Sequence, residues 1–198
     1  CYLVEGVSGK IIKDGTTADV NSLYPSMMHS ESGNVYPVCK PNFWKGSEIP
    51  KMALQPNKYY FIRIRCRFKL KEGKLPFVQI KHDYRYRSTD MLKTSDVYNR
   101  KDGKYYSQYY DSDGKLHDTI ITMTLTKTDY ILLREHYDLY DFEILDGCWF
   151  YAIKGIFDEY IDKYKKIKMT NKGAKRTEAK LFLNNLYGKM ATSRVSIA

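Results

Sequence analysis

The chain has 198 residues, a formal net charge of +10 and 43% hydrophobic residues. This length supports a core of its own, and the hydrophobic share excludes a disordered polypeptide. No run of about 18 apolar residues occurs, which excludes a transmembrane helix. The four cysteines stand far apart without a CxxC pair, so neither a zinc site nor a disulfide framework is expected. Because the first residue is Cys1 rather than methionine, we expect a piece of a larger protein.

The charge is uneven along the chain. Residues 58–104 carry a net charge of +9 and residues 154–194 a net charge of +7, whereas residues 111–146 carry −6. Two separate basic regions favour a polyanionic partner, with nucleic acid the first candidate. The alternative is that the lysines and arginines form solvated faces.

The first part of the chain predicts two short elements followed by loop. Residues 16–20 have the composition of a short strand, and residues 22–29 that of a helix with Ser22 as its N-cap. Five of the six prolines lie between Pro25 and Pro56, which predicts mostly irregular structure after residue 33.

Residues 59–70 predict a strand in which apolar residues alternate with cations. Period two places the apolar residues on one face and four cations on the other: Arg63, Arg65, Arg67 and Lys69. The basic row spans about 20 Å, so it is suited to follow a phosphate backbone. A charged face that protects a sheet from edge pairing is the equally open alternative.

Residues 71–153 predict a β-rich region. A turn at Glu72-Gly73 is followed by a return strand over 76–80 whose Val78 faces inward. Residues 84–110 carry seven tyrosines, which either stack on unpaired bases or pack a β-rich surface. The later elements are predicted as hairpin turns at Asp102-Gly103 and Asp113-Gly114, a strand over 119–126, a short helix over 127–136 and an extended segment over 139–152.

A pair of helices is predicted from Gly155 onward, with a break at 171–173. On the second helix, from about Ala174 to Thr192, the core stripe is predicted to contain Ala179, Phe182, Leu183, Leu186 and Met190. A second stripe beside it contains Arg176, Lys180, Asn184 and Tyr187. Two cations, an amide and a phenol in one row favour a phosphate-binding function over a solvated face.

Two motifs resemble those of family B DNA polymerases. Asp19-Val20-Asn21-Ser22-Leu23-Tyr24-Pro25 matches the DxxSLYP motif, and the stretch from Lys180 to Gly188 matches KxxxNSxYG, with Asn185 where serine is usual. Three phrases resemble the protein-primed polymerases of small bacteriophages and linear plasmids: residues 70–73, 79–81 and 135–140. The resemblance covers most of the chain and is weakest before residue 13 and between about Asp96 and Lys115.

The resemblance implies an α+β fold in three parts. Residues 1–32 would be a partial palm, residues 33–154 the β-rich insertion that contacts the terminal protein and encloses DNA, and residues 155–198 an antiparallel helix pair, the fingers. It implies a DNA-directed DNA polymerase that adds dNTPs to a 3′-hydroxyl with two Mg²⁺ ions. The expected partners are a DNA template-primer, a dNTP and a terminal priming protein, in the cytoplasm of a bacterial host of a phage or prophage, or less plausibly in a mitochondrion with a linear plasmid.

The resemblance also implies roles for single residues. Asp19 would be a catalytic metal ligand, with the Val20 carbonyl as a further oxygen. Lys168, Arg176 and Lys180 would neutralise the triphosphate, although Arg176 stands where lysine is expected. Tyr24 would pack under the sugar. Tyr187 and Asn184 would complete the nucleotide site, with Gly188 allowing DNA to approach closely.

One expected feature is missing from the sequence. The family's second catalytic carboxylate lies in a YxDTDS motif that does not occur here, so we expect the chain alone not to polymerise. The alternative function is a non-catalytic module that binds DNA or a terminal protein. The four histidines have no spacing typical of metal ligands and are interpreted as structural: His29, His82, His117 and His136.

Overall fold

The computed structural model describes residues 9–192 and has the α+β composition that the sequence predicts. The chain divides into two compact units. The sheet unit contains Lys40–Phe150 with residues 9–11, and the helical unit contains Ile12–Cys39 with the residues from Tyr151 onward. The predicted division into three parts at residues 32 and 154 remains a prediction about the family's architecture.

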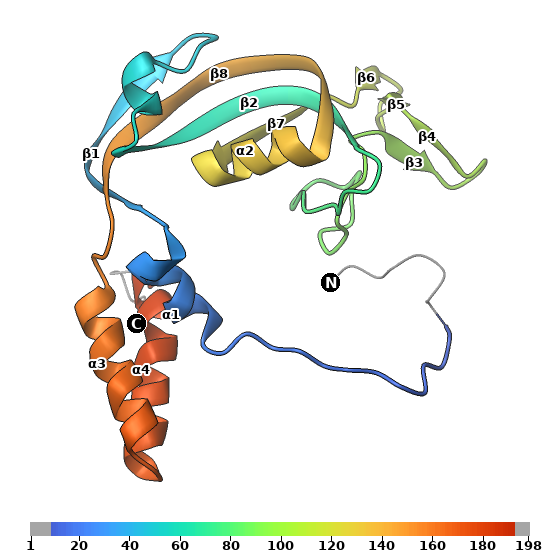
Figure 1. Cartoon of the computed structure of the whole chain (residues 1–198). Helices are drawn as coiled ribbons and strands as arrows, with labels where there is room; N and C mark the ends of the chain where they lie inside the picture. The colour runs from blue at the N-terminus through green and yellow to red at the C-terminus, as the bar shows by residue number, and fades with distance from the viewer. Residues whose placement is uncertain (1–8, 193–198) are drawn as a thin grey trace, which may run out of the picture. The chain divides into compact units, whose positions relative to one another are not determined.

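A four-stranded sheet dominates the sheet unit (Figure 1). Its strands are β1 (Tyr36–Lys45), β2 (Lys58–Leu70), β7 (Ile121–Thr126) and β8 (Tyr137–Ile153). They lie in the order β1-β8-β2-β7, and β2 pairs antiparallel with β7, for example Ile64 opposite Met123. Helix α2 (Lys127–His136) lies in the concave side of the curled sheet (Figure 1).

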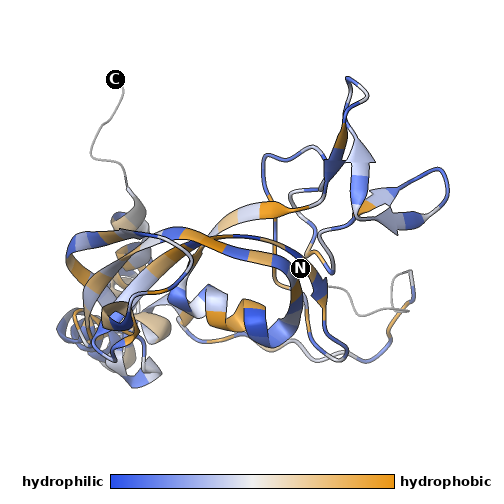
Figure 2. Cartoon of the chain, turned by 90° about the horizontal axis from the view of Figure 1, so that it is seen from above, coloured by the Kyte–Doolittle hydropathy of each residue, from blue (hydrophilic) through white to orange (hydrophobic). Residues whose placement is uncertain are grey.

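The core of the sheet unit follows the alternation predicted for β2. Ile62, Ile64, Cys66 and Phe68 are fully buried, whereas Arg65 and Lys69 on the opposite face are exposed. Figure 2 shows this alternation as bands of orange and blue along the strands. The buried face packs against Tyr130 and Leu133 of α2. Thr126 begins that helix as its N-cap by accepting a hydrogen bond from the Asp129 backbone N–H.

The prediction of irregular structure between residues 33 and 56 is wrong for β1. This strand contains Pro37 and Pro41, which lack a backbone donor. The topology explains how they are accommodated, because β1 lies at the edge of the sheet and one side of an edge strand needs no partner. A 3₁₀ turn, Lys51–Leu54, follows and buries Ala53 completely.

The predicted return strand over 76–80 is also wrong, although Val78 is buried as expected. The backbone of this segment bonds to a side chain instead of a neighbouring strand. The buried Tyr137 hydroxyl accepts hydrogen bonds from the N–H groups of Phe77 at 2.9 Å and Val78 at 3.3 Å, and donates to the Leu92 carbonyl at 2.9 Å. The Tyr137 hydroxyl thus links β8 to the backbone at Phe77 and Val78 and to the backbone at Leu92.

Two small hairpins contain much of the tyrosine-rich region, and both turns fall where the sequence predicts them. Strands β3 (Val97–Asn99) and β4 (Lys104–Tyr106) are joined through Asp102-Gly103. Strands β5 (Gln108–Tyr110) and β6 (Leu116–Asp118) are joined through Asp113-Gly114.

The helical unit contains α1 (Leu23–Met28), the 3₁₀ turn η1 (Ser30–Ser32), α3 (Asp158–Thr170) and α4 (Ala174–Ala191). The helix pair confirms the pattern-based prediction. The predicted strand over 16–20 is wrong: these residues are exposed and outside any strand, since no strand among residues 9–192 pairs with them. The core stripe of α4 is narrower than predicted, because Phe182 and Met190 are 40% and 58% exposed.

Candidate functional site

The site is built where α1 packs on the helix pair. Met28 of α1, Ile161 of α3, and Leu183 and Leu186 of α4 form one buried apolar cluster. Tyr36 and Phe157 pack against it and meet edge to face. Burial of these side chains fixes the motif that contains Ser22 and Tyr24 against the helices that carry the predicted phosphate ligands.

A cavity of about 310 Å³ lies beside this cluster, with Ser22, Lys168 and Arg176 in its lining. The Lys168 ammonium donates to the Ser22 hydroxyl at 3.0 Å, and the Arg176 guanidinium donates to the Lys168 carbonyl at 3.3 Å. The structure therefore brings together two of the three cations predicted to bind a triphosphate. A cavity lined by ammonium and guanidinium groups is suited to an anion.

Ser22 stands at the N-cap position of α1 but does not cap it. Its backbone is left-handed, with φ 51°, and its side chain makes no capping hydrogen bond. The hydroxyl bonds to Lys168 instead. The prediction of the helix start is confirmed, while the reason given for it, side-chain capping, is wrong. This serine links the motif to the end of α3.

Two predicted nucleotide-site aromatics contact each other directly. The rings of Tyr24 and Tyr187 are stacked with centroids 4.6 Å apart and planes 4° apart. Both are about half exposed, at 57% and 51%. Stacked rings on a half-open surface present flat apolar faces that a sugar or base can use.

The remaining predicted residues of α4 lie on its exposed side. Lys180 and Asn184 follow Arg176 by one and two helical turns and are exposed, in line with the predicted second stripe. Gly188 is exposed, and a Cβ added there would have no atom within 4 Å. Among the described residues, therefore, no neighbouring atom requires glycine at this position. The predicted role of Gly188, to let DNA approach closely, stays a prediction.

Asp19 and Val20 precede this cluster on an exposed, extended segment. A carboxylate and a backbone carbonyl are oxygen ligands that suit Mg²⁺, which also retains water and substrate phosphates in its shell. Within residues 9–192, no group of three or more histidine, cysteine or acidic side chains is arranged to hold a metal ion. The Asp19 carboxylate and the Val20 carbonyl fit the oxygen chemistry of a magnesium ion.

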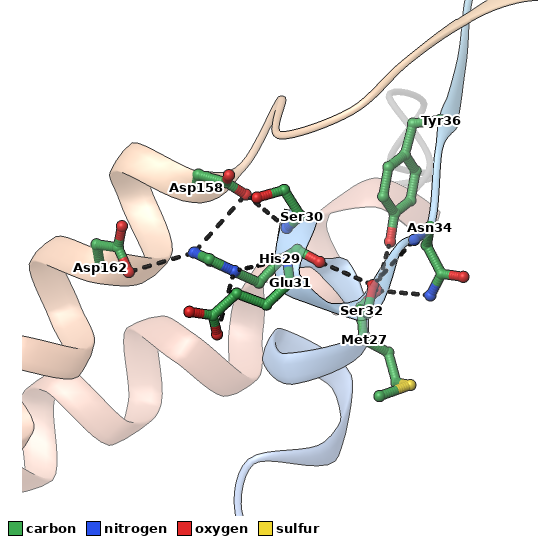
Figure 3. Close-up of polar contacts among 9 residues, drawn as sticks. All are labelled: Met27, His29, Ser30, Glu31, Ser32, Asn34, Tyr36, Asp158 and Asp162. Atoms are coloured by element: carbon green, nitrogen blue, oxygen red, sulfur yellow. Dashed lines mark hydrogen bonds and ion pairs between the residues drawn. The ribbon is translucent and has the colours of Figure 1, made fainter. Parts of the chain in front are cut away.

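A polar network ties the end of α1 to the start of α3 (Figure 3). His29 Nδ1 accepts a hydrogen bond from the Glu31 N–H at 3.1 Å, and Nε2 lies 3.3 Å from Asp162 Oδ1 and 3.9 Å from Asp158 Oδ1. The Ser30 N–H donates to Asp158 at 2.9 Å. This bonding by Ser30 lowers the pKa of the Asp158 carboxyl, with a further contribution from His29.

Among the cavity residues that were not identified from the sequence, two carry basic side chains. Lys165 lines it one turn before Lys168, and the spacing of Ile161, Lys165 and Lys168 on α3 is the signal that would have placed them on one face. His29 also lines it. The polar network around His29 agrees with the interpretation of this histidine as structural. That interpretation did not include the position of His29 beside the cations.

The basic row of β2 belongs to the sheet unit and is partly neutralised. Arg63 binds Asp146 with two hydrogen bonds, and Arg67 donates to Asp141 at 2.7 Å. These bonds raise the pKa of both guanidinium groups. Because β2 lies between β8 and β7, the alternative that the row protects a sheet edge is wrong. Arg65 and Lys69 are exposed and form no ion pair among residues 9–192.

Comparison with known proteins defines the class as a DNA polymerase. The family model for DNA polymerase type B, organellar and viral, matches residues 2–197. The chain belongs to this family.

Individual relatives narrow the comparison to phage enzymes. The chain is 36% identical to the DNA polymerase of Bacillus phage phi29 over 192 residues, and 31% identical to that of Streptococcus phage Cp-1 over 180 residues. These matches cover 97% and 90% of the chain, which spans 29% and 28% of the length of the two relatives.

Solved structures agree. The chain matches phi29 DNA polymerase complexed with primer-template DNA and incoming nucleotide substrates at a TM-score of 0.66 and 36% identity, covering 88% of this chain and 26% of that one. The phi29 enzyme complexed with single-stranded DNA matches at a TM-score of 0.62. Among residues 9–192, no helix is both long and apolar enough to cross a lipid bilayer.

Proposed function

We propose that the chain is the nucleotide-binding segment of a DNA polymerase that adds dNTPs to a 3′-hydroxyl on a DNA template-primer. One observation carries the proposal: Ser22, from the motif that begins with Asp19, is hydrogen-bonded to Lys168 beside Arg176. Groups from distant parts of the sequence thus meet at a cavity suited to a triphosphate. The phi29 structure with DNA and incoming nucleotides supports the same assignment.

In this proposal the cations neutralise the charge that the leaving pyrophosphate gains. Lys168, Arg176 and Lys180 contact phosphate oxygens, with Asn184 beside them. Tyr24 and Tyr187 separate to admit the sugar and base, and Gly188 lies against the DNA. Asp19 and the Val20 carbonyl hold part of the magnesium site, and bound magnesium would stabilise charge on the reacting phosphate. The cations of the β2 row that are not paired with an aspartate contact the DNA backbone. Protein priming is proposed from the family resemblance.

Nucleotide binding by the chain tests the site itself. Lys180→Ala should raise the dissociation constant for a dNTP about tenfold or more, since a hydrogen bond to a charged group contributes about 1.5–3 kcal/mol. Lys189→Ala is the matched control, because Lys189 is an exposed lysine on the opposite side of the same helix. Equal losses in both variants would show that only overall charge matters and would refute the proposed site.

Catalysis is tested in a longer protein. In a chimera, this chain replaces the matching segment of phi29 DNA polymerase, and primer extension is measured. We expect the chimera to extend primers and Asp19→Asn to abolish extension while nucleotide binding persists. The chain alone should not extend a primer, because it lacks the second carboxylate. Extension by the chain alone would contradict this, whereas nucleic-acid binding without any nucleotide binding would favour the non-catalytic module.

A further inference from the structure

The tyrosine-rich hairpins expose aromatic rings that a packing role would bury. Tyr98 and Tyr105, on the facing strands β3 and β4, are 51% and 61% exposed. Tyr60, on β2 of the same unit, is 3% exposed. Preference of tyrosine for strands explains why these residues occur in hairpins, but it does not explain why their rings face solvent.

A basic groove of about 620 Å³ lies beside these two rings. Tyr98 and Tyr105 form part of its lining, and their centroids are 5.2 Å apart with planes tilted by 55°. The charged groups in the lining are four cations and two acids: Arg85, Arg87, Lys93, Arg100, Asp90 and Asp96. Arg85 is paired with Asp83, so the exposed Arg87 and Arg100 are the cations that complement a polyanion.

One wall of the groove is held rigidly by its own contacts. Arg85 makes paired hydrogen bonds to the Asp83 carboxylate and lies over the rings of Tyr86, at 5.3 Å, and Tyr109, at 5.0 Å. The Tyr86 hydroxyl donates to the Ser95 carbonyl. Because this wall is already ordered, a ligand would lose little free energy in organising it.

We propose that this groove binds a single strand of nucleic acid, with unpaired bases stacked on Tyr98 and Tyr105 and phosphates beside Arg87 and Arg100. Aromatic faces next to cations are the features that bind single strands without sequence preference. A duplex already stacks its bases on one another, so it offers only its phosphates to such a groove. This binding goes beyond the proposed function, because it requires no triphosphate, no metal and no residue of the helical unit.

The test measures fluorescence anisotropy of labelled oligonucleotides of about 15 nucleotides, a length near the largest single-strand site sizes. Oligo-dT and oligo-U arms distinguish DNA from RNA, and binding of either one supports the proposal. The double variant Tyr98→Ala/Tyr105→Ala should weaken binding at least about fivefold, whereas Tyr98→Phe/Tyr105→Phe should stay within about twofold because it keeps both rings.

A charge control separates the groove from general attraction. Arg87→Ala/Arg100→Ala should reduce the slope of log affinity against log salt by about 1.4, at about 0.7 for each cation on a single strand. Lys40→Ala/Lys45→Ala removes the same charge from exposed positions on β1 and should leave the slope nearer to wild type. The proposal is overturned if the unmodified chain binds no oligonucleotide, if the alanine and phenylalanine pairs bind alike, or if the alanine pair weakens duplex binding as much as it weakens single-strand binding.

Discussion

Replacement of Tyr137 by phenylalanine removes one oxygen atom and leaves three backbone groups without their partner. Tyr137 is 1% exposed, and its hydroxyl bonds to the N–H groups of Phe77 and Val78 and to the Leu92 carbonyl. A buried polar group left without a hydrogen bond costs about 1–3 kcal/mol. Counting the two bonds of 2.9 Å at the lower end of this range and the longer one as a small addition, Tyr137→Phe should lower the free energy of unfolding by at least about 2 kcal/mol.

Tryptophan fluorescence during urea unfolding measures the change in the stability of the sheet unit. The sequence has two tryptophans, Trp44 and Trp149, and both belong to the sheet unit that contains Tyr137. Tyr60→Phe is the matched control: its ring is 3% exposed on the same sheet, and its hydroxyl makes none of the hydrogen bonds found among residues 9–192. We expect that control to change stability by less than about 1 kcal/mol.

A small loss of stability would refute the interpretation that the Tyr137 hydroxyl holds separate segments of the sheet unit together. If Tyr137→Phe and Tyr60→Phe shift the urea midpoint equally, the hydroxyl contributes no more than any buried phenol. An unchanged slope of the unfolding free energy against urea is also required, because a changed slope would mean that the denatured or native ensemble had altered.

Two further predictions concern a close contact and an ionised group. Gly147→Ala should lower the stability of the sheet unit by about 1–3 kcal/mol, because the new Cβ would overlap the Trp44 ring and the Phe61 carbonyl oxygen. A shifted Trp44 emission should accompany the loss. An unshifted, equally stable variant would show that the strand moves aside freely. Hydrogen bonding lowers the pKa of Asp158, so its contribution to stability is present above the ordinary aspartate range and is lost as pH falls through the lowered value. The stability gap between wild type and Asp158→Ala, measured by circular dichroism, should therefore close in acid, and a gap that widens there would contradict the assignment.

Elements with a strong burial pattern were predictable. Strand β2 and helix α2 follow period two and helical spacing because one face of each is buried. Strand β1 was missed because its prolines read as loop, and only its place at the sheet edge makes them acceptable. The segment at Phe77 was mistaken for a strand because its alternation is real, while its backbone partner is a side chain 60 residues away.

Two of the three phrases that narrowed the family resemblance take part in one set of polar contacts. The phrase over 135–140 contains Tyr137, and the phrase over 70–73 contains Lys71, whose ammonium donates to the Arg134 carbonyl at 2.7 Å. The Lys71 N–H also donates to the His136 carbonyl. These residues therefore hold segments of the sheet unit together through polar contacts. The residues proposed to bind nucleotide lie in the helical unit instead.

The site could be predicted only in part, since its contacts join residues far apart in sequence. The family resemblance implied roles for Tyr24 and for Lys168, Arg176 and Lys180, whereas Ser22 was predicted only as a helix cap. His29 was missed as a neighbour of the cavity because the carboxylates that face it, Asp158 and Asp162, follow it by more than 120 residues. Nothing in the local sequence around a single histidine encodes such a pair.

The contacts within the helical unit also explain how a basic cavity is stable without its ligand. The Lys168 ammonium is bonded to Ser22, and the Arg176 guanidinium to a backbone carbonyl, so each cation has a hydrogen bond to a neutral acceptor. Tyr24 and Tyr187 similarly cover each other's faces. A phosphate oxygen carries negative charge, so it attracts both cations electrostatically in addition to accepting a hydrogen bond, whereas a hydroxyl or a carbonyl is neutral. On the proposed function, a nucleotide would replace weak internal contacts with stronger ones, and its binding free energy would be the difference between the two sets.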